Sequence, residues 1–140
     1  MPKRVTPPEA AALLKEGWVY LDVRSIPEFE AGHPTGATNI PIMHARGGGM
    51  MPNADFQKVV QATFAKDAKI VVGCKSGGRS QTAAGLMLSA GFTDVVDMRG
   101  GFGGERDAMG RVSVPGWADA GLPVSTAAEP GKSYAALTKE

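Results

Sequence analysis

The chain has 140 residues, the size of one domain, and its 43% hydrophobic content is enough for a buried core. Its 15 basic and 14 acidic residues give a net charge of +1. It therefore lacks the basic excess of nucleic-acid-binding proteins, and we expect no nucleic-acid partner. No apolar run approaches the roughly 20 residues that span a bilayer, and the N-terminal segment lacks the apolar stretch of a signal peptide. We therefore expect a cytoplasmic protein without a membrane partner.

The cysteine and histidine content limits the chemistry further. A single cysteine excludes an internal disulfide, which fits a reducing compartment. One cysteine and two histidines are too few and too scattered for a structural zinc site. We therefore expect neither a metal nor a cofactor.

The first half of the chain alternates helix and strand signals. Thr6 and Glu9 bracket two prolines in the pattern of a capping box, which predicts a helix that continues to Glu16. The further elements expected in this half are a strand at 19–23, a short helix at 26–31 that Ser25 caps, a strand at 37–40, a mobile loop at 43–52 and a helix that Asn53 caps.

The second half continues this alternation and then loses it. Strands are expected at 69–72 and 95–98, with a helix between them. Residues 103–116 are rich in glycine and charge and predict a surface excursion, and residues 117–121 can form one helical turn. Residues 125–140 have little apolar content, which predicts a tail that is flexible or packed against an edge.

Strands that alternate with helices predict the α/β class. We expect a central, mainly parallel sheet of about five short strands, flanked by helices on both faces. In such sheets, ligands bind at the carboxyl ends of the strands. Cys74 directly follows the apolar strand at 69–72 and Gly73, so the pattern places the cysteine at that end.

Cys74 opens the segment that carries most of the chemical information, which leads from the strand into a helix. Backbone N–H groups converge at such a turn, and the helix N-terminus adds partial positive charge. Both favour the thiolate form of cysteine, which is the reactive form. We expect Cys74 to be a nucleophile for small anions. The anion cradle around it is expected to consist of Lys75, Ser76, Gly77, Gly78 and Arg79.

Other interpretations of this segment stay open. A lone cysteine is more often a small buried hydrophobe than a nucleophile. Gly73, Gly78, Arg79 and Ser80 also match the spacing of a nucleotide-binding P-loop, with arginine in place of lysine. Arginine is not equivalent to the phosphate-bridging lysine, so nucleotide binding is the weaker interpretation.

A series of short motifs runs along the chain. They are Leu21–Arg24, Glu28–Phe29, Gly32–His33, Gly36–Ala37, Asn39–Pro41, Cys74–Arg79, Gly100–Phe102 and Ala120–Val124. In this order they resemble the motifs of rhodanese-type sulfurtransferases. The resemblance implies a rhodanese-like domain at residues 5–124, with residues 125–140 as a tail. Pro34, where the family has an aliphatic residue, and the long stretch at 103–116 depart from the family pattern.

The resemblance implies covalent catalysis in two steps. The Cys74 thiolate attacks the outer sulfur of thiosulfate or of a persulfide donor, and the cysteine then carries a persulfide. An acceptor such as cyanide, a thiol or a protein partner takes this sulfur. Lys75 is expected to hold the sulfonate of the donor, and Arg79 to line the anion pocket or to brace the loop.

Asp22 and Arg24 end a neighbouring strand and are expected to support the site from behind. In this interpretation Arg24 pairs with Glu28, and Asp22 ties down a loop.

Competing functions are a cysteine-dependent phosphatase or arsenate reductase, a non-catalytic rhodanese-like binding or regulatory module, and a persulfide carrier for a protein partner. The phosphatases and reductases separate their cysteine and arginine by five residues, whereas four residues separate Cys74 from Arg79. The shorter loop favours the transfer of a single sulfur. The binding modules often lack the cysteine, which this chain retains.

Overall fold

A computed structural model describes residues 3–46, 49–75 and 78–138 of the chain. Its centre is a five-stranded sheet in the order β1-β8-β7-β2-β4, in which every neighbouring pair is parallel. The strands are β1 (Lys3–Val5), β2 (Val19–Asp22), β4 (Thr38–Asn39), β7 (Lys69–Gly73) and β8 (Asp94–Met98). Strand β1 was not predicted from the sequence, and the other four were.

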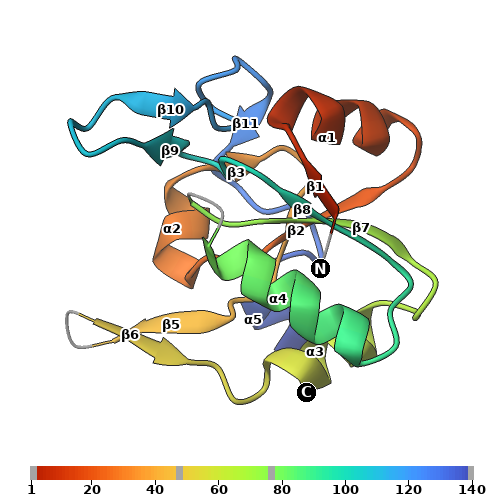
Figure 1. The fold of residues 1–140 in the computed structure, drawn as a ribbon. Coiled ribbons are helices and arrows are strands. Elements are labelled where there is room, and N and C mark those ends of the chain that lie inside the picture. Colours follow the sequence, from red (N-terminus) through yellow and green to blue (C-terminus); the bar gives the residue numbers. More distant parts are fainter. Residues whose placement is uncertain (1–2, 47–48, 76–77, 139–140) are drawn as a thin grey trace.

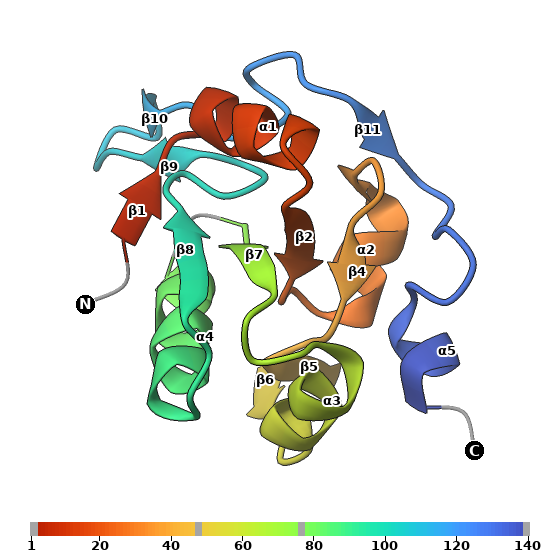
Figure 2. The same ribbon diagram turned by 90° about the vertical axis from the view of Figure 1, so that its right-hand side faces the viewer.

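Helices lie on both sides of this sheet (Figure 1; Figure 2). They are α1 (Pro7–Lys15), α2 (Ile26–Ala31), α3 (Phe56–Thr63), α4 (Gly78–Ser89) and α5 (Tyr134–Thr138). Leu21 and Val72 belong to a buried cluster that includes side chains of α3 and α4. Their neighbours Tyr20 and Val71 belong to a second cluster, which includes side chains of α1. Alternate residues of β2 and β7 are thus buried on opposite faces, and the predicted fold class is confirmed.

The helix starts follow the sequence signals at α1 but not at α3. The Thr6 hydroxyl accepts a hydrogen bond from the Glu9 N–H at 3.3 Å, and the Glu9 carboxylate accepts from the Thr6 N–H at 2.8 Å. This reciprocal pair confirms the predicted capping box. Helix α3 begins at Phe56, later than predicted, because the Asn53 side chain accepts from the Asp55 N–H at 3.0 Å and forms a turn before the helix.

Two segments that were predicted to be irregular form antiparallel ribbons. Strand β5 (Met43–Arg46) pairs with β6 (Gly49–Pro52), so the predicted loop over 43–52 is wrong for the described part; residues 47–48 lie outside the described residues. Strand β9 (Glu105–Arg106) pairs with β10 (Val112–Val114) inside the predicted surface excursion (Figure 1). Neither ribbon shows the apolar alternation by which a half-buried strand is recognised, because both are largely exposed.

The C-terminal segment runs along the edge of the domain (Figure 2). Strand β11 (Val124–Ser125) pairs with the short strand β3 (His33–Pro34). In α5, the Tyr134 hydroxyl accepts a hydrogen bond from Asn53 Nδ2 at 3.1 Å, and Tyr134 and Leu137 pack against the cluster that contains α3. Residues 124–138 therefore contact the rest of the domain both at their first strand, β11, and at their last helix, α5.

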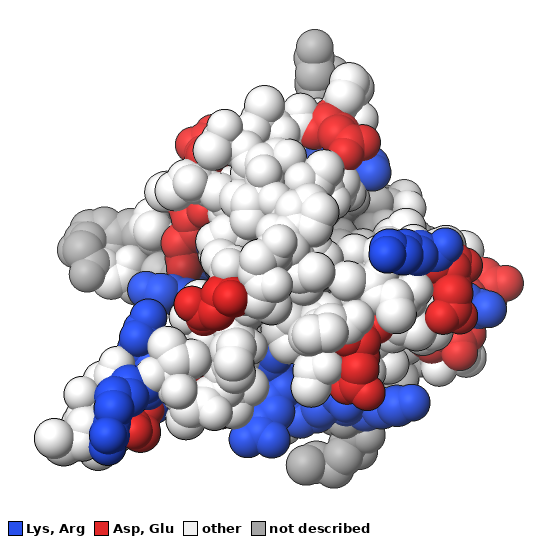
Figure 3. Space-filling model, turned by 90° about the horizontal axis from the view of Figure 1, so that it is seen from above, with Lys and Arg blue, Asp and Glu red and all other residues white. Residues whose placement is uncertain are grey.

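The surface carries both signs of charge. On the face seen in Figure 3, basic and acidic side chains surround a broad uncharged area, and neither sign covers the face. Across the part of the chain that the structure describes, no helix has both the length and the apolar character needed to cross a membrane. Nor do three or more His, Cys, Asp or Glu side chains gather into a possible metal site among these residues.

Candidate active site

Cys74 lies between the last residue of β7 and the loop that leads to α4, at the carboxyl end of the sheet. Its side chain is 1% exposed and belongs to the buried cluster beneath α3 and α4. Tyr20 on β2 fixes the backbone just before it, because a Cβ atom on Gly73 would overlap the Tyr20 hydroxyl. Glycine at position 73 thus lets the buried tyrosine pack directly against the strand that presents the cysteine.

A backbone clamp holds Cys74 and Lys75 from the other side. The N–H of Phe102 donates to the carbonyl of Cys74, and the N–H of Gly103 donates to the carbonyl of Lys75, both at 2.7 Å. Gly101, with a φ of +57°, allows this close approach, since a Cβ atom there would overlap the Cys74 carbonyl. The glycine-rich motif at 100–102, recognised only as a family match, therefore orients the first two peptides of the loop.

Arg79 is held by α2. Its two terminal guanidinium nitrogens donate to the two carboxylate oxygens of Glu28 at 2.7 and 2.9 Å. Ser25 adds hydrogen bonds to Glu28 from its N–H at 3.1 Å and its hydroxyl at 2.9 Å. Burial disfavours the charged carboxylate, but the hydrogen bonds from Arg79 and Ser25 outweigh it and lower the pKa of Glu28 to about 2. This geometry favours the bracing role considered for Arg79.

Arg24 pairs with Asp22, so its predicted pairing with Glu28 is wrong. The Arg24 guanidinium donates to both carboxylate oxygens of Asp22, at 2.7 Å for the shortest contact, and to the carbonyl of Gly32 at 2.6 Å. Its Cζ atom lies 4.4 Å from the centroid of the Phe102 ring. Arg24 therefore bridges the end of β2, the end of α2 and the segment that clamps Cys74.

A buried polar chain that was not predicted lies behind Cys74. The Cys74 thiol donates to the Ser80 hydroxyl at 3.5 Å, and the Ser80 hydroxyl donates to Asp97 Oδ1. The other carboxylate oxygen of Asp97 accepts from Arg4 Nε at 2.8 Å. Ser80 and Asp97 are both 0% exposed. No local signal pairs these residues, because α4, β8 and β1 bring them together only in the folded chain.

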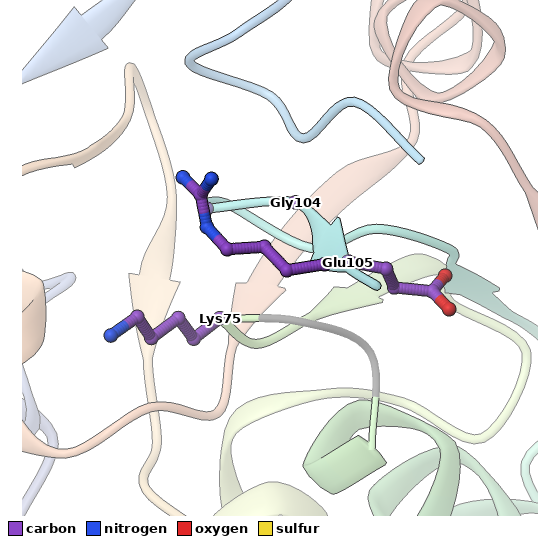
Figure 4. A pocket seen from close by; sticks show the side chains of 5 residues that line it. Lys75, Gly104 and Glu105 are labelled. Carbon is purple, nitrogen blue, oxygen red and sulfur yellow. The ribbon is translucent and has the colours of Figure 1, made fainter. Parts of the chain in front are cut away.

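An open cleft of about 720 Å³ lies beside the start of the loop. The residues that line it are Lys75, Gly103, Gly104, Glu105 and Arg106. The Lys75 and Glu105 side chains extend in opposite directions from this cleft (Figure 4), and Glu105 pairs with Arg99 at 3.2 Å. Strand β9, part of the ribbon that the family pattern did not account for, thus lines the cleft together with Lys75.

The sequence model of the Rhodanese-like domain matches residues 6–104. The chain belongs to the rhodanese-like family. This match ends before the β9–β10 ribbon and before the C-terminal segment.

Named relatives agree with this membership. Thiosulfate sulfurtransferase 16, chloroplastic, from Arabidopsis thaliana is 42% identical over 123 residues, which is 88% of this chain and 92% of that protein. Senescence-associated protein DIN1 from Raphanus sativus is 44% identical over 93 residues, 66% of this chain, and the matched part spans only 51% of that protein. The crystal structure of Rv0390 from M. tuberculosis superposes with a TM-score of 0.76 at 26% identity, covering 89% of this chain and 98% of that one.

The rhodanese-like domain brings most of the predicted site residues to one end of the sheet. The backbone carbonyls of Cys74 and Lys75 are both held by the clamp, and Arg79 follows at the start of α4. Gly78 is exposed at the first residue of that helix, whereas Ser76 and Gly77 lie outside the described residues. Asp22 and Arg24 form one buried pair behind the loop.

Replacing Glu28 by glutamine should lower the free energy of unfolding by about 2 kcal/mol at neutral pH, since charged hydrogen bonds of this kind are worth roughly 1.5–3 kcal/mol. The folded-state pKa of Glu28 is depressed from 4.5 to about 2, so its stabilising effect is complete above about pH 4.5 and is lost as the pH falls towards 2. Denaturant melts of both proteins across this pH range measure the effect. The stability difference between wild type and Glu28→Gln should shrink on acidification. Glu30→Gln, an exposed carboxylate on the same helix, is the control and should change little.

Proposed function

We propose that this chain is a sulfurtransferase that moves a sulfane sulfur from thiosulfate or a persulfide donor, through a persulfide on Cys74, to a thiophilic acceptor such as cyanide or a thiol. The Cys74 thiolate attacks the outer sulfur of thiosulfate. The sulfur–sulfur bond of the donor breaks, and sulfite leaves with its electron pair. The acceptor then attacks the outer sulfur of the persulfide, and the Cys74 thiolate is restored.

The observation that carries this proposal is the placement of Cys74. It stands at the carboxyl end of a central parallel strand, four positions before Gly78, the first residue of the twelve-residue helix α4. The positive end of that helix favours a thiolate and a persulfide anion over their neutral forms. The clamp turns the Cys74 carbonyl towards Phe102, so the N–H of the same peptide, which belongs to Lys75, points away from the clamp. The family membership and the relative named as a thiosulfate sulfurtransferase support the same reaction.

Loop length argues against a phosphatase. Four residues separate Cys74 from Arg79, one fewer than in the cysteine-dependent phosphatases and arsenate reductases that were considered. In addition, the two terminal nitrogens of Arg79 already bind Glu28, so they are engaged by the protein itself. A tetrahedral oxyanion would have to displace this bidentate pair to use them.

The acceptor side of the reaction has more room than cyanide needs. The cleft beside Lys75 is open and about 720 Å³ in volume, and Arg106 from the ribbon lines it together with Lys75. This space supports a thiol acceptor, whether a small molecule or a cysteine on a partner protein. A persulfide carrier would use the same Cys74 and would differ only in its acceptor.

The direct test is turnover of thiosulfate with cyanide, followed as thiocyanate formation, and with a small thiol, followed as sulfite release. We expect steady-state turnover with at least one of the two acceptors. Reduced and folded protein that turns over neither would contradict the enzymatic function. Loading by thiosulfate followed by discharge only to a protein thiol would instead favour the carrier.

Replacing Lys75 by alanine should raise KM for thiosulfate more than it lowers kcat. Lys75 is exposed and directly follows the nucleophile, and its side chain lines the cleft. The sulfonate oxygens of the donor carry charge in both the ground state and the transition state, so the contact contributes mainly uniform binding. A partly exposed contact of this type is worth about 1–2 kcal/mol, which corresponds to roughly a tenfold rise in KM.

Salt and a matched variant complete this test. The wild-type KM should rise with ionic strength, because the screening length shrinks to about 8 Å at 0.15 M salt, and the Lys75→Ala KM should respond less. Lys69→Ala removes the same charge from the opposite end of β7, where the side chain is also exposed, and should leave KM unchanged. Equal KM values for Lys75→Ala and wild type at low salt would remove Lys75 from the donor site.

A further inference from the structure

A hydrogen-bonded chain leads from the nucleophile into the interior of the domain. It runs from Cys74 Sγ to Ser80 Oγ over 3.5 Å, from Ser80 to Asp97 Oδ1, and from Asp97 Oδ2 to Arg4 Nε over 2.8 Å. Cys74 is 1% exposed and Ser80 and Asp97 are 0% exposed, whereas the Arg4 side chain is 33% exposed. A carboxylate and a thiol are thus joined, within a buried region, by a single hydroxyl group that both donates and accepts.

We propose that Ser80 and Asp97 form a proton relay that takes the thiol proton from Cys74. The proposal rests on the proposed function only in treating Cys74 as the nucleophile. As the S–H bond breaks, its proton passes to Ser80 Oγ, and the proton that Ser80 already carries passes to Asp97 Oδ1. One S–H bond and one O–H bond are replaced by two O–H bonds, and the negative charge moves from the Asp97 carboxylate to the sulfur.

The roles of the two residues differ. Ser80 touches the reacting sulfur and is a catalytic residue in this scheme. Asp97 acts through Ser80 and is a positioning residue, because it fixes the direction of the Ser80 hydroxyl and holds the displaced proton. When the acceptor removes the sulfur and restores the thiolate, the same path returns the proton to Cys74.

The surroundings of Asp97 make it a suitable proton acceptor. Burial raises the pKa of Asp97 above its ordinary value, against the hydrogen bonds from Ser80 and Arg4, and the negative charge of Glu105 on β9 adds to the rise. On the β2 side the nearby titratable group is Tyr20, whose pKa burial raises well above 10, so its hydroxyl stays neutral. Arg4 is the one cation that contacts Asp97 among the described residues, and it limits the rise.

A pH profile separates a proton relay from a purely structural role. Moving the proton from Cys74 to Asp97 changes no net charge. The thiolate formed in this way therefore has a pH-independent population until the Cys74–Asp97 pair takes up a second proton. The rate of Cys74 alkylation by iodoacetamide should therefore fall with decreasing pH and then level off in a shoulder. A thiol that titrates alone would instead lose rate about tenfold for every pH unit, with no shoulder.

Two variants and one control decide the proposal. Asp97→Asn keeps the size of the side chain and an oxygen that accepts from Ser80, and Ser80→Ala removes the connecting hydroxyl. Both should lose the shoulder and show the simple slope, about tenfold per pH unit. Asp94→Asn alters an acidic residue at the other end of β8 that lies near the surface, and it should keep the wild-type profile. Arg4→Gln removes the cation from Asp97 and should move the acid end of the shoulder to higher pH.

The readout is independent of sulfur transfer, because alkylation needs no sulfur donor. A failure of thiosulfate to load Cys74 would therefore contradict the proposed function and leave this test intact. A shoulder that persists in Asp97→Asn and Ser80→Ala, or its absence from wild type, would overturn the relay. If Asp97→Asn does not fold, as judged by circular dichroism, the comparison of Ser80→Ala with wild type decides alone.

Discussion

Replacing Cys74 by serine should abolish sulfur transfer and leave the fold in place. Serine is close to cysteine in size, but its hydroxyl is a far weaker acid than the thiol and forms no persulfide. By analogy with the loss of other covalent nucleophiles, we expect kcat to fall by ~10⁴-fold or more. The new hydroxyl would lie beside Ser80 Oγ, which accepts from the Cys74 thiol at 3.5 Å, so a hydrogen-bond partner is already present.

Thiocyanate formation and thermal melts of wild type and Cys74→Ser measure the two parts of this expectation. Cys74→Ala is the matched control, because it removes the nucleophile without adding a buried hydroxyl. Both variants should be inactive, and both should melt cooperatively. Turnover in either variant at more than background would show that the sulfur passes through another group.

Replacing Gly101 by alanine should damage both stability and activity. Its φ of +57° disfavours any side chain, and a Cβ atom would lie 2.6 Å from the carbonyl carbon of Lys75. The Trp117 N–H also donates to the Gly101 carbonyl at 2.8 Å, which restrains the segment against shifting. Left-handed strain and overpacking together should cost about 2–4 kcal/mol of unfolding free energy. Displacement of the clamp should lower kcat/KM about 100-fold, the cost of roughly 1 Å of misplacement in an active site.

Gly121→Ala is the control for this experiment. Gly121 has a φ of +73°, but no atom lies within 4 Å of the position of a Cβ. This variant should therefore show only the backbone strain, about 1–2 kcal/mol, with kcat/KM unchanged. Equal effects of the two variants on activity would mean that the clamp at residues 101–103 does not position the loop.

The central sheet was largely readable from the sequence, because its strands are buried on both faces. Lys69–Gly73, between α3 and α4, and Asp94–Met98, which follows α4, stand out as short apolar runs. Strand β1 was missed since two of its three residues are exposed and charged, and its strand character comes from pairing with β8. The β5–β6 ribbon was missed for a similar reason, as its Met50 and Met51 side chains face solvent.

Site residues could be predicted only where a reactive side chain stands in a recognisable local sequence pattern. Cys74 was singled out as the candidate nucleophile because a cysteine between a strand and a helix is itself a signal, and its role stays a prediction. Glu28 was paired with Arg24 in the prediction, whereas the structure pairs it with Arg79; Arg79 is 51 positions away and Arg24 is the nearer cation in the sequence. The chain from Ser80 to Asp97 and Arg4 was missed, since Arg4 is 93 positions from Asp97 and only the β1–β8 register joins them.

The intact mass of the reduced protein, before and after treatment with thiosulfate, shows whether Cys74 takes up a sulfur atom. We expect a gain of one sulfur atom on wild type, its removal by cyanide, and no gain on Cys74→Ser. An unchanged mass in reduced, folded wild-type protein would contradict the proposal that Cys74 accepts a sulfur from thiosulfate.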